Sequence, residues 1–289
     1  MYRYLIKRAS AVMEALPYLL KFHGKTIVIK YGGSAMTQEE LKEGVIQDLV
    51  LLKYVGLNPI IVHGGGHLVT KYLKRKKIET KFVCGLRVTG KRVLEAVEKV
   101  LGGKINRDIV RMIKKSGGKA KGLYGKKGKV IKARKLWIKS DKGKWVDLGY
   151  TGRVVGIRYR YLRKLMKRGY IPVISPLGVG EKGKRFNINA DSAASAVASF
   201  LKAEKLILLT DVRGVLDKKG KFISEVDADK IKRMIKSRAI RGGMIPKVKC
   251  GLEALASGVE KVHIIDGRVP HAVLLEIFTD HGIGTMVVK

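Results

Sequence analysis

Apolar and polar positions follow two different periods along the first half of the chain. Short apolar runs rich in β-branched residues stand at 26–30 (TIVIK) and 58–63 (NPIIVH), and such runs are typical of buried strands. The segments that follow them, 38–56 and 64–77, repeat apolar residues at helical spacing, and the stretch ending at Gly117 predicts one or two further helices. This β-α-β-α order predicts a parallel sheet with helices on both faces.

The pattern changes between residues 119 and 157, where short β segments predominate. The turn-forming sequences GKKGK and SDKGK separate these segments, and we interpret both as hairpin turns. A helix is expected next at 161–169 and a strand at 170–178. We therefore expect this part of the chain to differ from the regular alternation on either side of it.

Strand and helix alternate again from residue 189 onwards. The expected elements are a helix at 190–203, a strand at 205–210, a hairpin at 211–223, a helix fed by a glycine loop at 242–258, a strand at 261–265, a helix at 271–280 and a strand at 284–289. The chain is therefore expected to form two α/β lobes, residues 1–188 and 189–289, with a cleft between them.

The first 22 residues form a basic segment with an apolar stripe. No acid precedes Glu14, and four apolar residues fall near one face of a helix: Leu5, Val12, Leu16 and Leu19. A mitochondrial presequence has a similar composition, whereas Glu14 and Pro17 interrupt the apolar run that a secretory signal needs. The simplest interpretation is an amphipathic helix of the mature protein that packs on another surface, for example a neighbouring subunit.

The overall composition is that of a globular protein. The chain has 289 residues, of which 46% are apolar, and this excludes a disordered chain. Cys84 and Cys250 lack the spacing of metal ligands, so we interpret both as reduced thiols of a cytoplasmic protein. No apolar run approaches the roughly 20 residues needed to span a bilayer, so no membrane association is expected.

The charge balance departs far from the ordinary range. The chain carries 61 Lys and Arg against 24 Asp and Glu, a formal net charge of +37. Charge of this size attracts polyanions without specificity, but it says nothing about the fold. The sequence favours a merely solvated basic surface and leaves open a surface that binds polyanions.

Glycine turns follow apolar runs in the sequences IVIKYGGS and IVHGGG, and GGMIPK fits the same design less strictly. In an open parallel sheet such turns lie at the carboxyl ends of the strands, where ligands bind and where free backbone N–H groups favour anions. Lys30, at the end of a buried strand, needs a negative partner. A phosphate site is therefore predicted, although the patterns of a P-loop, a protein kinase and a dinucleotide-binding Rossmann fold are all missing.

Phosphoryl transfer needs positive charge around the moving group and little covalent help from the protein. Lys30 and Lys247 can supply that charge from the two lobes, because both stand in glycine-flanked turns. Two lysines aimed at one point repel each other, and Asp191 is the best candidate for an acid between them. On spacing alone, however, helix capping is the favoured interpretation of Asp191.

Several long segments are together similar to known proteins. GKTIVIKYGGSAM, PIIVHGGGH, GLRVT, FNINADSAA, AEKLILLTDVRGVLD, GGMIPKVKCGLEAL and VHIIDGRVPHAVLLEIFTDHGIGTM resemble the acetylglutamate kinases of the amino-acid kinase family, in order and without a large gap. The resemblance implies a three-layer αβα sandwich with a mainly parallel open sheet. It also implies phosphoryl transfer from MgATP to the γ-carboxylate of N-acetyl-L-glutamate, the second step of arginine biosynthesis, with an N-terminal substrate and dimerisation lobe and a C-terminal ATP lobe.

The resemblance also implies roles for single residues. Lys30 stabilises the transferring phosphoryl group, Lys247 stabilises the leaving ADP, and Asp191 orients both lysines. The remaining implied contacts are to phosphoryl oxygens (the N–H groups of Gly33 and Gly65), to the substrate (Gly64, Gly65, Arg87 and Asn187) and to the nucleotide (Gly32, Gly33, Thr210, Asp211 and Val212). No metal-binding side chains are implied, because phosphates can hold Mg²⁺.

Three positions depart from the family pattern. His67 stands where the family usually has proline, Lys249 replaces a usual acid, and His281 replaces a glutamate common in arginine-inhibited relatives. The last change removes an attractive partner for arginine, so weak or absent inhibition is expected. The N-terminal extension resembles that of hexameric relatives, which implies a homohexamer built as a trimer of dimers, with a dimer as the alternative.

Two other functions stay open from the sequence. One is a related kinase that acts on acetylaminoadipate or on a carrier-linked substrate, which the basic surface would suit. The other is a scaffold on the kinase fold that binds polyanions without turnover. The presence of Lys30, Asp191 and Lys247 together argues against the scaffold.

Overall fold

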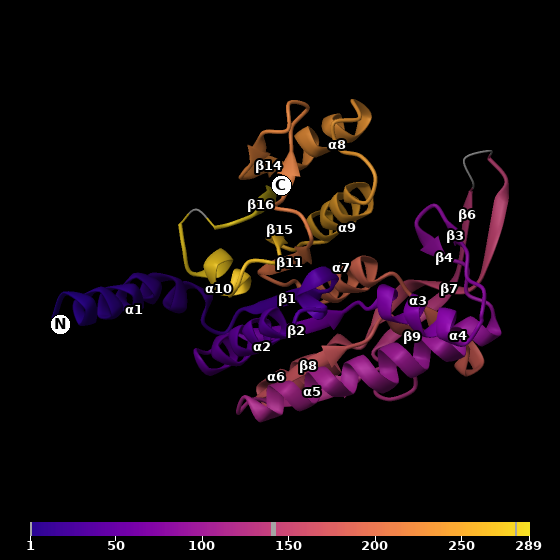
Figure 1. Cartoon of the computed structure of the whole chain (residues 1–289), viewed down its shortest axis with the longest axis horizontal. Coiled ribbons are helices and arrows are strands. Elements are labelled where there is room, and N and C mark those ends of the chain that lie inside the picture. Colours follow the sequence, from indigo (N-terminus) through magenta and orange to yellow (C-terminus); the bar gives the residue numbers. More distant parts are fainter. Residues whose placement is uncertain (1, 140–142, 281) are drawn as a thin grey trace.

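The computed structural model describes residues 2–139, 143–280 and 282–289, and an eight-stranded sheet organises them (Figure 1). The strands lie in the order β14 (Glu225–Asp227), β16 (Thr285–Val288), β15 (Lys261–Asp266), β11 (Lys205–Thr210), β1 (Thr26–Tyr31), β2 (Asn58–His63), β8 (Tyr170–Ile174) and β5 (Lys119–Leu123). The strands from β15 to β5 are parallel to their neighbours, whereas β16 is antiparallel to β15. The predicted, mainly parallel sheet is confirmed.

Helices cover both faces of this sheet. One face packs against α6 (Tyr159–Lys167), α7 (Ala190–Leu201), α8 (Ala228–Lys236) and α9 (Met244–Ala256). The other face packs against α2 (Glu39–Tyr54), α3 (Gly66–Arg75), α4 (Lys91–Val97), α5 (Asn106–Lys115) and α10 (Ala272–Ile277). The expected three-layer αβα sandwich is therefore present.

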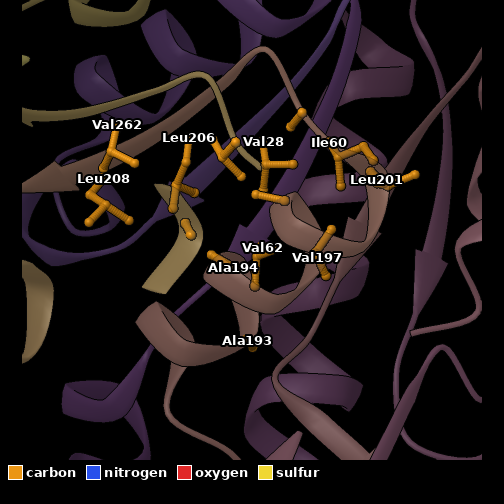
Figure 2. Close-up of a cluster of buried hydrophobic side chains, with 14 of the residues drawn as sticks. Val28, Ile60, Val62, Ala193, Ala194, Val197, Leu201, Leu206, Leu208 and Val262 are labelled. Carbon is orange, nitrogen blue, oxygen red and sulfur yellow. The ribbon is translucent and has the colours of Figure 1, made fainter. Parts of the chain in front are cut away.

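The two hydrophobic cores follow the two faces of the sheet. Side chains alternate along β1, so Val28 joins one core while Ile27 and Ile29 join the other. Figure 2 shows Val28 in the first core together with Leu206 of β11 and Val197 of α7. Each core thus contains residues from both halves of the chain.

The predicted lobe boundary near residue 188 corresponds to a line within the sheet. Strands that precede it lie on one side of the β1–β11 pair, and strands that follow it lie on the other. Because β1 and β11 pair directly and both cores cross this line, the division into separate lobes stays a prediction.

A small closed barrel lies beside the main sheet. It consists of β10 (Arg185–Asn187), β7 (Trp145–Ile157), β6 (Ile131–Lys139) and β9 (Leu177–Val179). The predicted hairpin of β6 and β7 is confirmed by their antiparallel pairing, although residues 140–142 of its turn lie outside the described residues. The expected hairpin at GKKGK is reduced to one antiparallel bridge between Tyr124 and Lys127, and it does not join β5 to β6, because β5 pairs with β8 in the main sheet.

Several other expectations need adjustment. The single strand expected at 170–178 is divided into β8 and β9, which belong to different sheets. The helical region before Gly117 consists of α4, a π-helical stretch η2 (Glu98–Ile105) and α5. Two short hairpins complete the fold, the expected β12 (Val215–Leu216) with β13 (Phe222–Ile223), and an unexpected β3 (Phe82–Val83) with β4 (Leu86–Arg87).

The expected N-terminal helix is α1 (Tyr2–Phe22), which extends away from the rest of the molecule (Figure 1). Several of its apolar side chains are exposed, among them Leu5, Ile6, Val12 and Leu16. Within the described residues, no helix is both long and apolar enough to cross a bilayer. The helix therefore presents an apolar surface that the rest of the described chain leaves uncovered.

Candidate active site

The glycine turns after β1 and β2 lie side by side, because these two strands pair in register up to Tyr31 and His63. Gly33 has φ +67° and Gly65 has φ +129°, conformations that L-residues rarely adopt. A cavity of about 280 Å³ opens at this edge of the sheet. Eight of the residues assigned from the sequence line it: Lys30, Gly32, Gly33, Gly64, Gly65, Arg87, Asn187 and Asp191.

Asp191 joins the two predicted lysines. Lys30 Nζ lies 3.1 Å from Asp191 Oδ1, and Lys247 Nζ donates a hydrogen bond of 3.2 Å to Asp191 Oδ2. Lys30 lies near the end of β1, Asp191 lies in the first turn of α7, and Lys247 lies in the first turn of α9. Three segments far apart in the sequence therefore place two ammonium groups on one carboxylate.

The capping interpretation of Asp191 is wrong. Asn189 is the N-cap of α7, and its side chain accepts a hydrogen bond of 3.0 Å from the backbone N–H of Ser192. Asp191 is therefore free to turn its carboxylate towards the lysines. The sequence offered a signal for this outcome, since Asn189 is itself a strong capping residue two positions earlier.

Burial and mutual attraction set the charges of this cluster. Burial lowers the pKa of Lys30, and the repulsion of Lys247 adds to this effect, whereas the carboxylate of Asp191 opposes it. Burial acts to raise the pKa of Asp191, but the attraction of Lys30 and Lys247 outweighs it and leaves the pKa below its usual value. The carboxylate is therefore ionised at neutral pH.

Hydrogen bonds fix the guanidinium of Arg87 at the lining of the cavity. Its Nη2 donates to the carbonyl of Gly66 at 3.0 Å and to Thr70 Oγ1 at 2.8 Å, and its Nη1 donates to Thr80 Oγ1 at 2.8 Å. The ring of Phe82 lies over the guanidinium, 4.6 Å from its carbon to the ring centroid. These contacts order a guanidinium that can meet a carboxylate in the cavity.

Two threonines that the sequence analysis did not single out hold this region together. Thr151 Oγ1 donates to the carbonyl of Arg87 at 2.6 Å, and Thr89 Oγ1 donates to the same carbonyl at 3.0 Å. Asn187 Nδ2 donates to Thr89 Oγ1 at 3.1 Å. Thr89 belongs to the GLRVT sequence, so that motif already contained the signal, whereas nothing local indicated Thr151.

His63 contacts the second glycine turn, and the sequence analysis missed this residue. The side chain is fully buried at the end of β2, and burial lowers its pKa to about 4. Its Nδ1 lies 2.9 Å from the carbonyl of Gly64, which can only accept, so Nδ1 carries the proton. Nε2 therefore accepts from Asn106 Nδ2 at 3.2 Å. A neutral imidazole thus fixes the first glycine of the HGGG turn.

The residues that the resemblance assigns to the nucleotide lie next to the first glycine turn. Asp211 Oδ1 accepts the backbone N–H of Ser34 at 2.6 Å, and a Cβ on Gly33 would come within 2.4 Å of that same carboxylate oxygen. Thr210 Oγ1 donates to the carbonyl of Val212 at 2.8 Å. In the described part of the chain, the lining of the cavity does not include Thr210, Asp211 and Val212. Lys247 is also outside the lining, and its hydrogen bond to Asp191 connects it to the cavity.

The structure describes two of the three residues that depart from the family pattern. His67 lines the cavity at the first turn of α3, and burial lowers its pKa while Asp211 opposes this effect. Lys249 is exposed on α9. His281 lies outside the described residues. Among the residues that the structure describes, no group of three or more His, Cys, Asp or Glu is arranged to hold a metal ion.

A parallel sheet, paired glycine turns and a lysine–aspartate–lysine cluster are together an arrangement that suits phosphoryl transfer on an αβα fold. A model of the amino acid kinase family matches residues 25–266. The chain belongs to this family.

Two relatives are similar over nearly their whole length. The chain is 54% identical to an acetylglutamate kinase of Caldanaerobacter subterraneus subsp. tengcongensis, over 98% of this chain and 94% of that protein. It is 52% identical to an acetylglutamate kinase of Heliobacterium modesticaldum, over 98% of this chain and 99% of that protein.

A solved structure with the same fold is an N-acetylglutamate synthase from Neisseria gonorrhoeae complexed with coenzyme A and N-acetyl-glutamate. Its TM-score is 0.86 at 26% identity, and the match covers 97% of this chain but only 63% of the synthase. The chain therefore spans nearly all of the two kinases and less than two thirds of the synthase.

Proposed function

We propose that the chain is an acetylglutamate kinase, which transfers the γ-phosphoryl group of ATP to the γ-carboxylate of N-acetyl-L-glutamate. The observation that carries the proposal is the pairing of Lys30 and Lys247 on Asp191 beside a cavity that also contains Arg87. Relatives at 54% and 52% identity over nearly the whole chain support the same reaction. The product is an acyl phosphate.

Arg87 and Asn187 hold the acceptor in this proposal. Three N–H groups of Arg87 are engaged by neighbouring oxygens, and in the described part of the chain the remaining donors of its five are left for a carboxylate. Arg87 therefore takes the α-carboxylate, helped by Asn187, while Gly64 and Gly65 close over the substrate. The γ-carboxylate then points towards Lys30, and no base is required because it is already ionised at neutral pH.

Electrostatic stabilisation is the main task of the two lysines. Negative charge moves from the attacking carboxylate through the phosphoryl oxygens to the leaving group. Lys30 meets the transferring phosphoryl group and Lys247 meets the leaving side, while the N–H groups of Gly33 and Gly65 donate to phosphoryl oxygens. Asp191 keeps the lysines at 3.1 and 3.2 Å, so that their mutual repulsion does not drive them apart before the substrate binds.

The nucleotide belongs beside Gly32, Gly33 and the segment Thr210–Val212. The glycine at position 33 allows the carboxylate of Asp211 to approach the turn closely, and the backbone N–H groups of the turn suit an anion. Mg²⁺ supplies charge neutralisation at the phosphates, which hold it with water. Asp211, whose carboxylate is bound to the N–H of Ser34, orders the turn on which the phosphates rest.

A hydroxamate assay for acyl phosphate tests the proposal. The chain is incubated with MgATP and N-acetyl-L-glutamate, and N-acetyl-L-aminoadipate is tested in parallel. We expect an ATP-dependent acyl phosphate with N-acetyl-L-glutamate at the higher kcat/KM. A preference for the longer acid favours the related kinase, and the absence of product with both acids contradicts the proposed reaction and favours a scaffold.

We further propose a homohexamer joined through α1. The exposed apolar residues of this helix, Leu5, Ile6, Val12 and Leu16, support a partner on it, because burial against a neighbouring copy removes that surface from water. Light scattering on the full chain and on a chain lacking residues 1–22 tests the proposal. We expect a hexamer for the full chain and a dimer for the shortened one, and a dimer in both cases contradicts it.

Regulation by arginine is proposed to be weak or absent. The support is the sequence, in which histidine replaces an acid at position 281 and the net charge of +37 opposes a guanidinium. Turnover measured against arginine tests this, and inhibition at micromolar arginine contradicts it. The same net charge supports non-specific binding of polyanions, for which a steep loss of binding with salt is the expected signature.

A further inference from the structure

The β6–β7 ribbon carries both tryptophans of the chain on its distal half. The two strands pair from Ile131 and Ile157 to Lys139 and Trp145, and their far ends extend past β3 and β4, away from the main sheet (Figure 1). Trp137 is 50% exposed and Trp145 is 65% exposed. Two large aromatic side chains therefore face solvent at a projecting part of the molecule.

The two tryptophans share one face of the ribbon with lysines. Trp137 lies opposite Asp147, and Lys139 lies opposite Trp145, and directly opposed residues of antiparallel strands point to the same side. Lys135 Nζ is 4.5 Å from the ring centroid of Trp137, and Lys139 Nζ is 5.3 Å from that of Trp145. Each ring is thus accompanied by an ammonium group.

Two arginines stand opposite each other nearer the base of the ribbon. Arg134 pairs in register with Arg153, and both side chains are exposed. Like charges at directly opposed positions destabilise a sheet, and the ion pair of Arg134 with Glu181 is long at 3.4 Å and solvent-exposed. Arg153 also lines a groove beside α7, so this arginine pair belongs to the other face of the ribbon.

The opposite face of the ribbon already serves the packing of the protein. Leu148 is fully buried, and Leu136, Ile138 and Val146 are half-buried. Leu136 lines a groove of about 380 Å³ that α7 also lines. The core therefore takes the aliphatic side chains, and the tryptophans are not required for it.

We propose that the solvent face formed by Lys135, Trp137, Lys139 and Trp145, called the ribbon stripe, binds single-stranded nucleic acid. Aromatic rings on which bases stack, interleaved with cations that meet phosphates, are the features shared by single-strand binding surfaces. From residue 135 to residue 139 the stripe measures roughly 13 Å at about 3.3 Å per residue. This length matches about four stacked nucleotides at 3.4 Å each.

The charge of the whole chain supports this choice of partner. A net charge of +37 draws a polyanion to every face, and the ribbon stripe adds the aromatic surface that a purely electrostatic site lacks. A duplex keeps its base faces stacked inside, so it cannot use the two rings. The inference does not depend on the proposed kinase reaction.

Intrinsic fluorescence gives a direct test, because the chain contains no tryptophan outside the stripe. An oligothymidylate of about 12 nucleotides, within the usual range of site sizes, is titrated into the full chain. We expect quenching of the tryptophan emission together with a rise in the anisotropy of a labelled oligonucleotide. Binding by anisotropy without quenching places the nucleic acid elsewhere and overturns the proposal, as does the absence of binding.

Alanine substitutions test whether the two tryptophans contribute to the affinity for the oligonucleotide. Trp137→Ala and Trp145→Ala should each weaken binding at least about fivefold, the factor that corresponds to ~1 kcal/mol, the lower end for one stacked base. Tyr54→Ala removes an exposed aromatic residue from α2 and should leave the affinity unchanged. Circular dichroism and urea denaturation show that each variant is folded. An unchanged affinity in both tryptophan variants overturns the proposal.

A charge-matched pair separates the stripe from the general basic surface. Lys135→Gln with Lys139→Gln should lower the salt slope by about 1.4, since each phosphate contact with a single strand contributes about 0.7. Lys218→Gln with Lys219→Gln, both exposed in the β12–β13 turn, removes the same charge. If the salt slope falls equally in both double variants, the proposal is overturned. Equal affinity and equal tryptophan quenching with a duplex also overturn it.

The stripe could also join two copies of the chain, and light scattering distinguishes this case. Under the proposal, Trp137→Ala and Trp145→Ala leave the oligomeric state unchanged. A smaller assembly in these variants identifies the stripe as a contact between subunits and overturns the proposal.

Discussion

Replacing Asp191 with asparagine tests the centre of the proposed mechanism. The substitution keeps the size of the side chain and removes the charge between Lys30 and Lys247, whose nitrogens lie 3.1 and 3.2 Å from the carboxylate oxygens. At an effective dielectric constant of about 20, unit charges at this distance attract each other by about 5 kcal/mol, an upper bound because the side chains relax. Two mostly buried ammonium groups then face each other without compensation.

The expected result is a loss of turnover with a changed pH profile. We expect kcat of Asp191→Asn to fall at least about 100-fold, the usual cost of misplacing one stabilising donor. Burial already lowers the pKa of Lys30, and the loss of Asp191 lowers it further. Lysine loses its charge as the pH rises through its pKa, so activity must decline at a lower pH than in the wild type.

A coupled assay of ADP release between pH 6 and 10 measures both quantities, because it follows turnover directly. Asp191→Glu is the matched control, since it keeps the charge and should retain more activity and a profile closer to the wild type. Circular dichroism and urea denaturation show whether each variant is folded under assay conditions. A folded Asp191→Asn variant with kcat within fivefold of the wild type and an unshifted alkaline decline would refute the assigned role.

Three further predictions follow from the same geometry. Lys30→Ala and Lys247→Ala should each lower kcat by about 100- to 1,000-fold with little change in either KM, and steady-state kinetics that show a change in KM alone contradict this. Arg87→Ala should raise the KM for N-acetyl-L-glutamate and spare that for ATP, because a charge-assisted bond contributes about 1.5–3 kcal/mol; a rise for ATP instead reverses the assignment. His63 has a pKa of about 4 in the folded chain and about 6.5 when unfolded, so its stabilisation is present above pH 6.5 and is lost as the pH falls towards 4. Between pH 7 and pH 5 this loss is about 2 kcal/mol of unfolding free energy, and His63→Asn should remove it in urea titrations; an equal pH dependence in the variant excludes His63 as its source.

The sequence indicated the elements that local patterns encode. The alternation of Ile27, Val28 and Ile29 between the two cores is a property of one strand, so a short window was enough to predict β1. The glycines after β1 and β2 were informative for the same reason, because a turn that requires a positive φ depends on the residues of the turn itself. Lys30 was recognisable as a site residue, since a charge at the end of a buried strand is costly without a partner.

Some local patterns were compatible with more than one structure. GKKGK has the composition of a hairpin turn, yet the strand before it, β5, pairs with β8, which lies about fifty residues later in the chain. The turn chemistry is the same whether the next strand folds back or departs to another sheet. Only the pairing of distant strands distinguishes the two outcomes, and that pairing depends on the assembled core.

The sequence by itself determined that a buried lysine needed an acid, and only the tertiary structure decided which acid. The chain has 24 acidic residues, and Asp191 stands at a position where helix capping was the simpler interpretation. The fold places the first turns of α7 and α9 beside the end of β1, so Lys30, Asp191 and Lys247 meet although 217 positions separate the first from the last. His63 and Thr151 are likewise ordinary in sequence, and their role follows from carbonyl groups that only the folded chain brings to them. The physical reason is that hydrogen bonds and ion pairs act over a few ångströms of space, whereas sequence patterns describe neighbours along the chain.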